Sequence, residues 1–257
     1  MRPWYGVGAL VLVCVASCGG KEPAVERIGT ATSPIQGGTT DTTDSFAVGI
    51  VQTSQLQSSS MVAFCSGVLL APNLVATARH CVAQLASATI DCSTSTFGPV
   101  ISTQYVWVTT DAVMNLQNGV LQDGIGVSSI VVPSQASQTS VCGNDIALLI
   151  LSQSIALPQY VMPTLNPPMT DPGYEATVSA IGYGIDTPTD TMGTSAGTRR
   201  IKQNVPLQCI PNDPTPSFDC FMQDQTANTY MAADEFISGD STCEGDSGSG
   251  AFEQGHF

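Results

Sequence analysis

The chain has 257 residues, of which 42% are hydrophobic; this apolar content is enough for a sizeable core and excludes a disordered protein. Only 11% are charged, compared with about 25% in an average soluble protein. Seven basic residues stand against 21 acidic ones, and the formal net charge of -14 disfavours nucleic acid as a partner. A polar but weakly charged composition of this kind suits an exported β-protein.

Residues 1–18 have the pattern of an export signal. Arg2 gives a positive start, and residues 6–15 form an apolar run that is too short to span a bilayer. The sequence VASC at 15–18 resembles the lipobox of bacterial lipoproteins, in which the signal is cut before the cysteine and Cys18 carries lipid. The alternative is an ordinary secretory signal in which Cys18 is incidental. We therefore expect export from a bacterial cell, as an outer-membrane lipoprotein before activation or as a secreted protein.

Residues 19–34 are expected to be a tether or propeptide, because turn and linker residues dominate and no apolar periodicity is present. No later segment approaches the roughly 20 apolar residues of a spanning helix, so a lipid anchor would be the only membrane contact. Beyond residue 34, short runs rich in Val and Ile alternate with turn residues, which predicts an all-β barrel or sandwich. The clearest expected strands are 46–52, 63–70, 74–77, 105–109, 130–132, 146–151 and 176–182.

Cysteine usage also indicates an oxidising compartment. Two of the nine cysteines lie in the signal, and the other seven are Cys65, Cys81, Cys92, Cys142, Cys209, Cys220 and Cys243. No CxxC pair and no Cys/His spacing typical of zinc occurs, so we expect disulfides, no metal and no cofactor. Seven is an odd number, so one of these cysteines lacks a partner.

Three segments carry the residue types of nucleophilic catalysis: 77–81 (TARHC), 144–149 (NDIALL) and 243–248 (CEGDSG). Each alone is a weak signal, because core histidines, aspartates that begin strands and polar turns are common structural features. Together they place His80, Asp145 and Ser247 in the chain order of the chymotrypsin type. Three further segments agree with that family: IQGG at 35–38, CSGVLL at 65–70 and GYG at 182–184.

The chain is therefore similar to the trypsin/chymotrypsin-type serine endopeptidases over about residues 35–250. The resemblance implies an all-β protease domain at 35–257, built as two antiparallel six-stranded β-barrels with the active site between them. It implies that Ser247 is the nucleophile, that His80 takes its proton and that Asp145 orients the imidazole. The backbone N–H groups of Gly245 and Ser247 would form the oxyanion hole.

The resemblance also implies that the protein is exported as a zymogen. A cut would create a new N-terminus at Ile35, whose ammonium would pair with the buried Asp246 carboxylate. Pro34 precedes that bond, so self-activation is doubtful and an activating protease is an expected partner. Arg27 offers a competing basic site, although the sequence after it lacks the double glycine.

The family places the floor of its specificity pocket six residues before the nucleophile. That position holds Ser241, which favours a neutral pocket for apolar or aromatic residues; a slip of one residue would put Asp240 there and favour Lys or Arg. The expected function is that of a monomeric serine endopeptidase acting on protein or peptide substrates. The alternative is a non-catalytic protease homologue that acts as a surface binding lipoprotein.

The expected disulfides are Cys65–Cys81, Cys209–Cys220 and Cys92–Cys142. In the family, the chain continues beyond the position of residue 257 with the last strands of the second barrel, and with the cysteine that pairs at the position of Cys243. We therefore expect an incomplete second barrel and a free thiol at Cys243.

Overall fold

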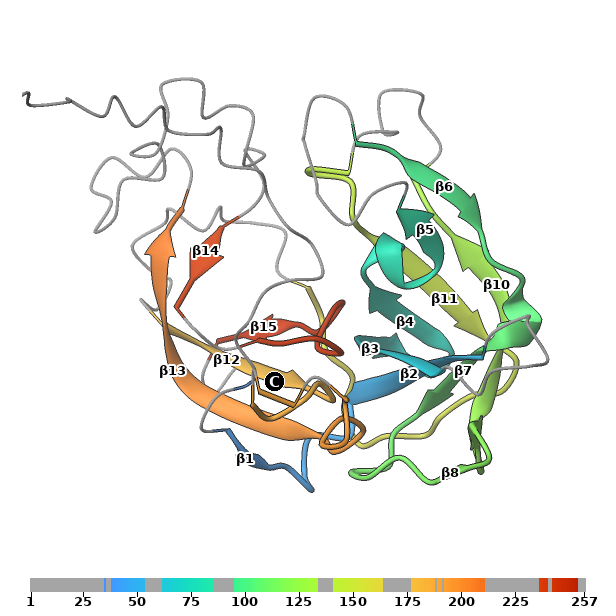
Figure 1. The fold of residues 1–257 in the computed structure, drawn as a ribbon, viewed down its shortest axis with the longest axis horizontal. Helices are drawn as coiled ribbons and strands as arrows, with labels where there is room; N and C mark the ends of the chain where they lie inside the picture. Colours follow the sequence, from blue (N-terminus) through green and yellow to red (C-terminus); the bar gives the residue numbers. More distant parts are fainter. Residues whose placement is uncertain are drawn as a thin grey trace, which may run out of the picture.

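The computed structural model describes residues 35, 38–53, 62–85, 95–133, 141–163, 177–187, 189–190, 192–210, 236–239 and 242–253. Within these ranges the chain is nearly all β, with two short 3₁₀ turns, η1 (Arg79–Cys81) and η2 (Thr103–Tyr105). Figure 1 shows two groups of strands side by side, one drawn from blue to yellow-green and the other mainly in orange and red. No helix in the described part of the chain has the length and hydropathy to cross a bilayer.

The first group is a closed barrel of six antiparallel strands in the order β10, β11, β4, β3, β2, β7. The bounds are β2 (Ala47–Thr53), β3 (Val62–Ala71), β4 (Leu74–Thr77), β7 (Val106–Thr109), β10 (Ile125–Val131) and β11 (Ala147–Leu151). All six strands overlap expected runs, so the first predicted barrel is confirmed. β10 begins at Ile125 and not at residue 130. The Gly and Ser residues of β10 lower its β-propensity, so the sequence does not predict the first half of the strand. Pairing with both β7 and β11 stabilises it in the fold.

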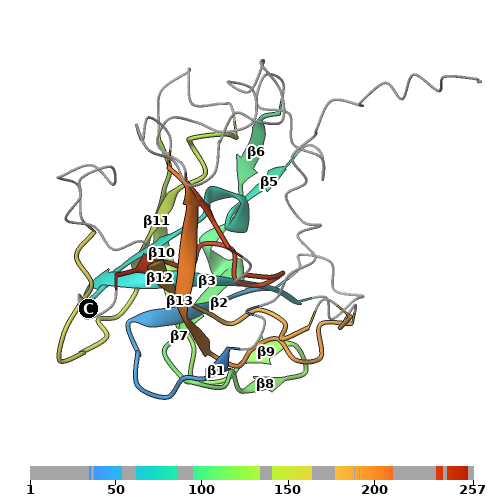
Figure 2. The ribbon, with the colours of Figure 1, turned by 90° about the vertical axis from the view of Figure 1, so that its left-hand side faces the viewer.

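The second group is a five-stranded sheet. Its path runs β1 (Thr39–Thr40), β13 (Arg200–Cys209), β12 (Thr177–Gly182), β15 (Ala251–Phe252), and β14 (Ile237–Ser238) pairs with β13. β13 is the long strand of this half in both views (Figures 1 and 2). Among the described residues this sheet stays open, with five of the six strands expected for a second barrel. Two small hairpins complete the strands: β5 (Ala83–Leu85) with β6 (Phe97–Val100), and β8 (Leu116–Gln117) with β9 (Val120–Leu121).

β2 joins the two halves because both of its faces are buried. Val48 and Ile50 point into the first barrel, where they join its core. Val51 packs with Tyr183 at the end of β12, and Ala47 packs with Ile181. A strand buried on both faces needs apolar residues at nearly every position, which explains the continuous AVGIV run.

The hydrogen bonds around a buried ion pair also tie the halves together. Arg199 Nε lies 2.9 Å from Asp41 Oδ2, and the two side chains are only 1% and 3% exposed. The guanidinium Nη1 donates further to the Thr110 carbonyl (2.9 Å), the Ala47 carbonyl (3.3 Å) and the Tyr183 hydroxyl (3.1 Å). Burial raises the pKa of Tyr183 to about 12, so the phenol stays protonated and donates onward. We refer to these five residues as the Arg199 network.

Candidate active site

β4 and β11 bring His80 and Asp145 to the same edge of the first barrel. Thr77, the last residue of β4, pairs with Ala147, the first residue of β11. The residues after β4 and those before β11 therefore lie together, and η1 turns His80 toward Asp145. His80 Nδ1 lies 2.6 Å from Asp145 Oδ2, and the His80 backbone N–H donates to Oδ1 at 2.8 Å. The structure thus brings together two residues that are 65 positions apart.

This geometry fixes the tautomer of the imidazole. The Asp145 carboxylate is an acceptor when ionised, so the proton of a neutral His80 sits on Nδ1. Nε2 is then left with its lone pair and can take a proton from a neighbouring hydroxyl. The two side chains are 18% and 25% exposed, which leaves the ring open to the solvent side of the barrel edge.

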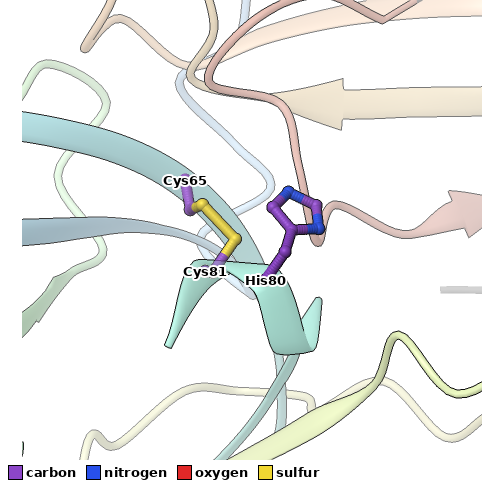
Figure 3. Close-up of side chains that lie close together, drawn as sticks. All are labelled: Cys65, His80 and Cys81. Atoms are coloured by element: carbon purple, nitrogen blue, oxygen red, sulfur yellow. A yellow bond between two sulfur atoms is a disulfide. The ribbon is translucent and has the colours of Figure 1, made fainter. Parts of the chain in front are cut away.

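A disulfide holds η1 against β3. Cys65 on β3 is bonded to Cys81, the residue after His80, which confirms this predicted disulfide. Figure 3 shows the imidazole of His80 projecting from η1 beside the two sulfur atoms. One donor atom from each of the three residues lies within 4.8 Å of the others. Because the two sulfurs are bonded to each other, the group offers no thiolate for a metal ion.

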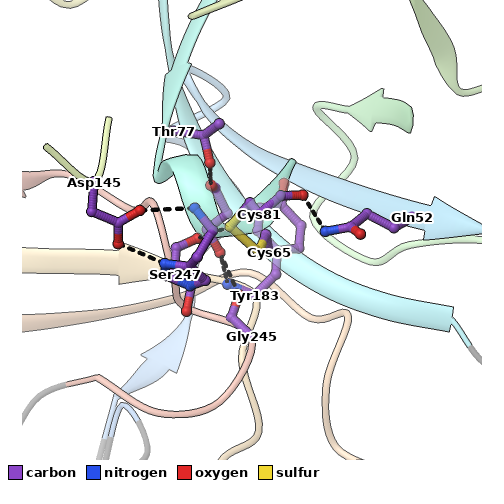
Figure 4. The surroundings of a disulfide bond; sticks show 10 residues. Gln52, Cys65, Thr77, Cys81, Asp145, Tyr183, Gly245 and Ser247 are labelled. Carbon is purple, nitrogen blue, oxygen red and sulfur yellow. Dashed lines mark hydrogen bonds and ion pairs between the residues drawn. A yellow bond between two sulfur atoms is a disulfide. The ribbon is translucent and has the colours of Figure 1, made fainter. Parts of the chain in front are cut away.

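Ser247 lies in a tight loop between β14 and β15. Within it, Asp246 N–H donates to the Cys243 carbonyl and Ser249 N–H to the Asp246 carbonyl, both at 2.9 Å. Gly248 has a φ of 82°, and a Cβ there would lie 2.1 Å from Thr77 Oγ1, so only glycine fits. Ser247, Gly245 and His80 line one pocket of about 300 Å³. The candidate nucleophile, base and oxyanion-hole glycine therefore line the same pocket. Figure 4 shows Ser247 and Gly245 close together near Asp145.

The peptide between Glu244 and Gly245 is held from outside the loop. The Glu244 carbonyl accepts the Ile185 N–H at 3.0 Å. In a trans peptide the N–H points away from the carbonyl, so this bond turns the Gly245 N–H to the opposite side. Gly245 has a φ of 97°, and a Cβ would meet the Gly184 Cα at 2.8 Å. The loop thus needs glycine at position 245 to hold this orientation of the peptide unit.

Asp246 is buried and only 2% exposed. Its carboxylate accepts the N–H groups of Gly184 (2.7 Å) and Cys243 (2.8 Å), and the backbone of Ile35 also hydrogen-bonds to it. Burial raises the pKa of Asp246 to about 7, although these hydrogen bonds and the charge of Arg200 oppose the shift. Ile35 is itself buried, at 2% exposed. The structure therefore places the two members of the expected activation pair in contact.

The remaining expected residues divide into described and undescribed ones. Cys142 is disulfide-bonded, and Cys243 is a buried free thiol. Ser241 and Asp240 lie outside the described residues, as do the signal with Cys18 and the tether at 19–34. The side chains of Cys92, Cys209 and Cys220, which carry the other expected disulfides, also fall outside that set.

Ser66 is a site residue to which the sequence analysis assigned no role. It is 1% exposed, and its hydroxyl hydrogen-bonds to the Gly245 carbonyl and the Tyr183 N–H. The only sequence signal is a hydroxyl between Cys65 and Gly67 in an otherwise apolar strand. A buried polar residue in a strand needs partners, but the sequence does not show which ones.

A closed β-barrel packed on a second sheet, with a His–Asp pair facing a serine loop, is the architecture of a chymotrypsin-like serine peptidase fold. The family model described as Trypsin matches residues 35–257, and the chain belongs to this family. Among solved structures it is similar to the scabies mite inactivated protease paralogue S-D1, with a TM-score of 0.56 and 17% identity over 86% of this chain and 83% of that one. At this identity the likeness shows the fold alone. The comparison with curated protein sequences gave no match.

Proposed function

We propose that this chain is a serine endopeptidase that hydrolyses peptide bonds through an acyl-enzyme. The observation that carries the proposal is the 2.6 Å contact between His80 and Asp145 in a site whose pocket also contains Ser247. In the first half-reaction, Ser247 Oγ attacks the peptide carbonyl and His80 Nε2 takes the hydroxyl proton. The negatively charged oxygen of the tetrahedral intermediate accepts hydrogen bonds from the N–H groups of Gly245 and Ser247. His80 then gives the proton to the departing amine, which leaves an ester on Ser247.

The second half-reaction repeats these steps with water. His80 removes a proton from water, and the resulting oxygen nucleophile attacks the ester carbonyl. Collapse of the tetrahedral intermediate breaks the bond to Ser247 Oγ, which recovers its proton from His80. The acid product leaves, and the site returns to its starting state without a metal or cofactor in any step.

We propose further that the chain is a zymogen that is activated by another protease cutting before Ile35. The contact between the Ile35 backbone and Asp246 supports this, because the cut would put an ammonium where an amide now stands. A buried ion pair there would hold the loop of Gly245 and Ser247 more firmly than an amide does. Ser241 is proposed as a neutral floor for an apolar or aromatic side chain of the substrate.

Anchoring would be coupled to activation if Cys18 carries lipid. Residues 19–34 contain no cysteine, so no disulfide would retain them after a cut before Ile35. Membrane-bound material should then keep residues 19–34, and soluble material should begin at Ile35. Fractionating expressing cells and sequencing both N-termini tests this; active enzyme that begins at Ile35 and stays on salt-washed membranes would contradict it.

The second candidate function is a non-catalytic binding role. The chain shares its fold, at 17% identity, with an inactivated protease paralogue, so the fold by itself does not require catalysis. The contact of His80 with Asp145 favours the enzyme, because a binding surface does not require that pair.

Replacing Ser247 distinguishes the two functions. Residues 30–34 of the full chain are replaced by an enteropeptidase recognition sequence, so that the cut before Ile35 can be made in vitro. Ser247→Ala should then abolish fluorophosphonate labelling and lower peptide turnover by about 10⁶-fold. Ser249→Ala, two residues along the same loop, is the matched control and should keep both. A cut chain that neither labels nor cleaves peptides would support the binding role.

A further inference from the structure

The loop that carries Gly245 and Ser247 is fastened through its carbonyl groups. Four successive carbonyls are hydrogen-bonded: Glu244 to the Ile185 N–H, Gly245 to the Ser66 hydroxyl, Asp246 to the Ser249 N–H and Ser247 to the Ser66 N–H. Two of the four bonds come from one residue, Ser66, which lies on β3 of the first barrel. The carbonyls of Gly245 and Ser247 flank the peptide unit that bears the Ser247 N–H, so Ser66 holds that unit from both sides.

The direction of the Ser66 hydroxyl is fixed by its two partners. The Tyr183 N–H is 2.9 Å from Oγ and can only donate, whereas the Gly245 carbonyl is 2.9 Å away and can only accept. The hydroxyl proton must therefore point at Gly245. This small group joins β12 of the second half to the catalytic loop, and Figure 4 shows Tyr183 and Gly245 side by side at this point.

The Ser66 backbone is itself held in place. Its carbonyl accepts the Thr77 hydroxyl at 2.7 Å, so the strand cannot shift away from β4 at this point. Ser66 is also adjacent to Cys65, whose disulfide runs to the residue after His80. The two neighbouring residues Cys65 and Ser66 of β3 thus attach this strand to the histidine turn and to the serine loop.

We propose that Ser66 is a positioning residue that sets the orientation of the oxyanion-hole donors. It touches neither the substrate nor the reacting atoms, and it acts through the peptide units of Gly245 and Ser247. Without the hydroxyl, the buried Gly245 carbonyl and the Tyr183 N–H would both lose a partner. The loop would then relax toward orientations in which the Gly245 N–H is aimed less well at the developing oxyanion. This role rests on the proposed endopeptidase function.

Ser66→Ala in the full chain, cut before Ile35, tests the role. Because removing an oxyanion-hole donor lowers kcat by 10²–10³-fold, misaiming one should lower kcat by about tenfold. KM should stay within about twofold, since the ground-state substrate does not use the oxyanion donors fully. The rate is expressed per active site, counted by fluorophosphonate labelling to completion, so that a loss of folded protein does not count.

The matched control is Ser179→Ala. Ser179 is 0% exposed on β12, and its hydroxyl has no hydrogen-bond partner within the described structure. It should keep kcat within twofold, because it removes a buried hydroxyl of the same kind from a place that does not hold the loop. If Ser66→Ala does not fold, Ser66→Gly removes the same hydroxyl together with its Cβ and takes its place.

A transition-state analogue gives a second readout that a merely structural role would not move. The affinity of Ser66→Ala for a peptide boronic acid should fall by the same factor as kcat/KM, while its affinity for the corresponding peptide amide stays unchanged. An active wild-type chain with kcat per site unchanged in Ser66→Ala overturns the positioning role alone. A wild-type chain with no Ser247-dependent hydrolysis overturns the proposed function, and the positioning role with it.

Discussion

Ionisation of Asp246 should destabilise the uncut chain. The carboxylate is buried with amide N–H partners, and its pKa is raised from 3.8 to about 7, mainly by burial. At about 1.4 kcal/mol for each pH unit, ionised Asp246 costs the folded chain about 4 kcal/mol relative to an unshifted carboxylate. The folded state keeps the proton up to about pH 7, whereas the unfolded state loses it near 3.8. Folding therefore takes up a proton between these values, and stability falls as the pH rises.

Asp246→Asn isolates this effect in a Ser247→Ala chain, which cannot digest itself. Urea unfolding at pH 5 and pH 8 gives the free energy of unfolding of each protein. The chain with Asp246 should lose about 3 kcal/mol more between these pH values than the Asn variant. Asn offers one acceptor fewer at every pH, so it shifts the whole curve and leaves the pH-dependent difference to Asp246.

Cutting before Ile35 provides the internal control. The new ammonium should pair with the carboxylate and lower its pKa, so the loss of stability between pH 5 and pH 8 should largely disappear. If the uncut chain with Asp246 and the uncut Asp246→Asn variant show the same pH dependence, within about 0.5 kcal/mol, the reasoning is refuted.

Three further expectations concern stability and reactivity. Arg199→Met should cost about 3–5 kcal/mol in urea unfolding, because it leaves the buried Asp41 carboxylate without its cation; a loss below about 1 kcal/mol would contradict this. Replacing Cys65 and Cys81 together by Ala should cost about 3 kcal/mol, since the disulfide closes a loop of 16 residues; an unchanged thermal midpoint would refute it. Burial raises the pKa of the Cys243 thiol, so iodoacetamide should label it slowly in the folded chain and quickly in urea, as peptide mapping can show.

The first barrel could be predicted well from the sequence because its strands carry their own signal. β4 is located at the predicted bounds, and β11 shows alternating burial along its ALLIL run. The catalytic candidates could be found because their segments occur in a recognisable order. Their meeting at one barrel edge follows from the pairing of Thr77 with Ala147, which no local pattern reveals.

The polar contacts between distant segments could not be predicted. Arg199 and Asp41 are 158 residues apart, and a single charged residue in a turn or strand is usually exposed. Both are buried here because each provides the opposite charge that the other needs, and the rest of the network provides hydrogen-bond partners for the guanidinium. The contacts of Ser66 could not be predicted for the same reason, since its partners Tyr183 and Gly245 lie 117 and 179 positions further along the chain.

The Arg199 network also has a consequence for folding during synthesis, because its members are made at different times. All six strands of the first barrel lie between Ala47 and Leu151, so they leave the ribosome well before Arg199. At a synthesis rate of about 5–20 residues per second, Arg199 is added roughly 8–30 seconds after Asp41. During that interval the Asp41 carboxylate and the Thr110 carbonyl must stay hydrated. We expect the surface of the nascent barrel around Thr110 to remain hydrated until residue 199 has been synthesised. A chain stalled just before that point should expose this surface to chaperones.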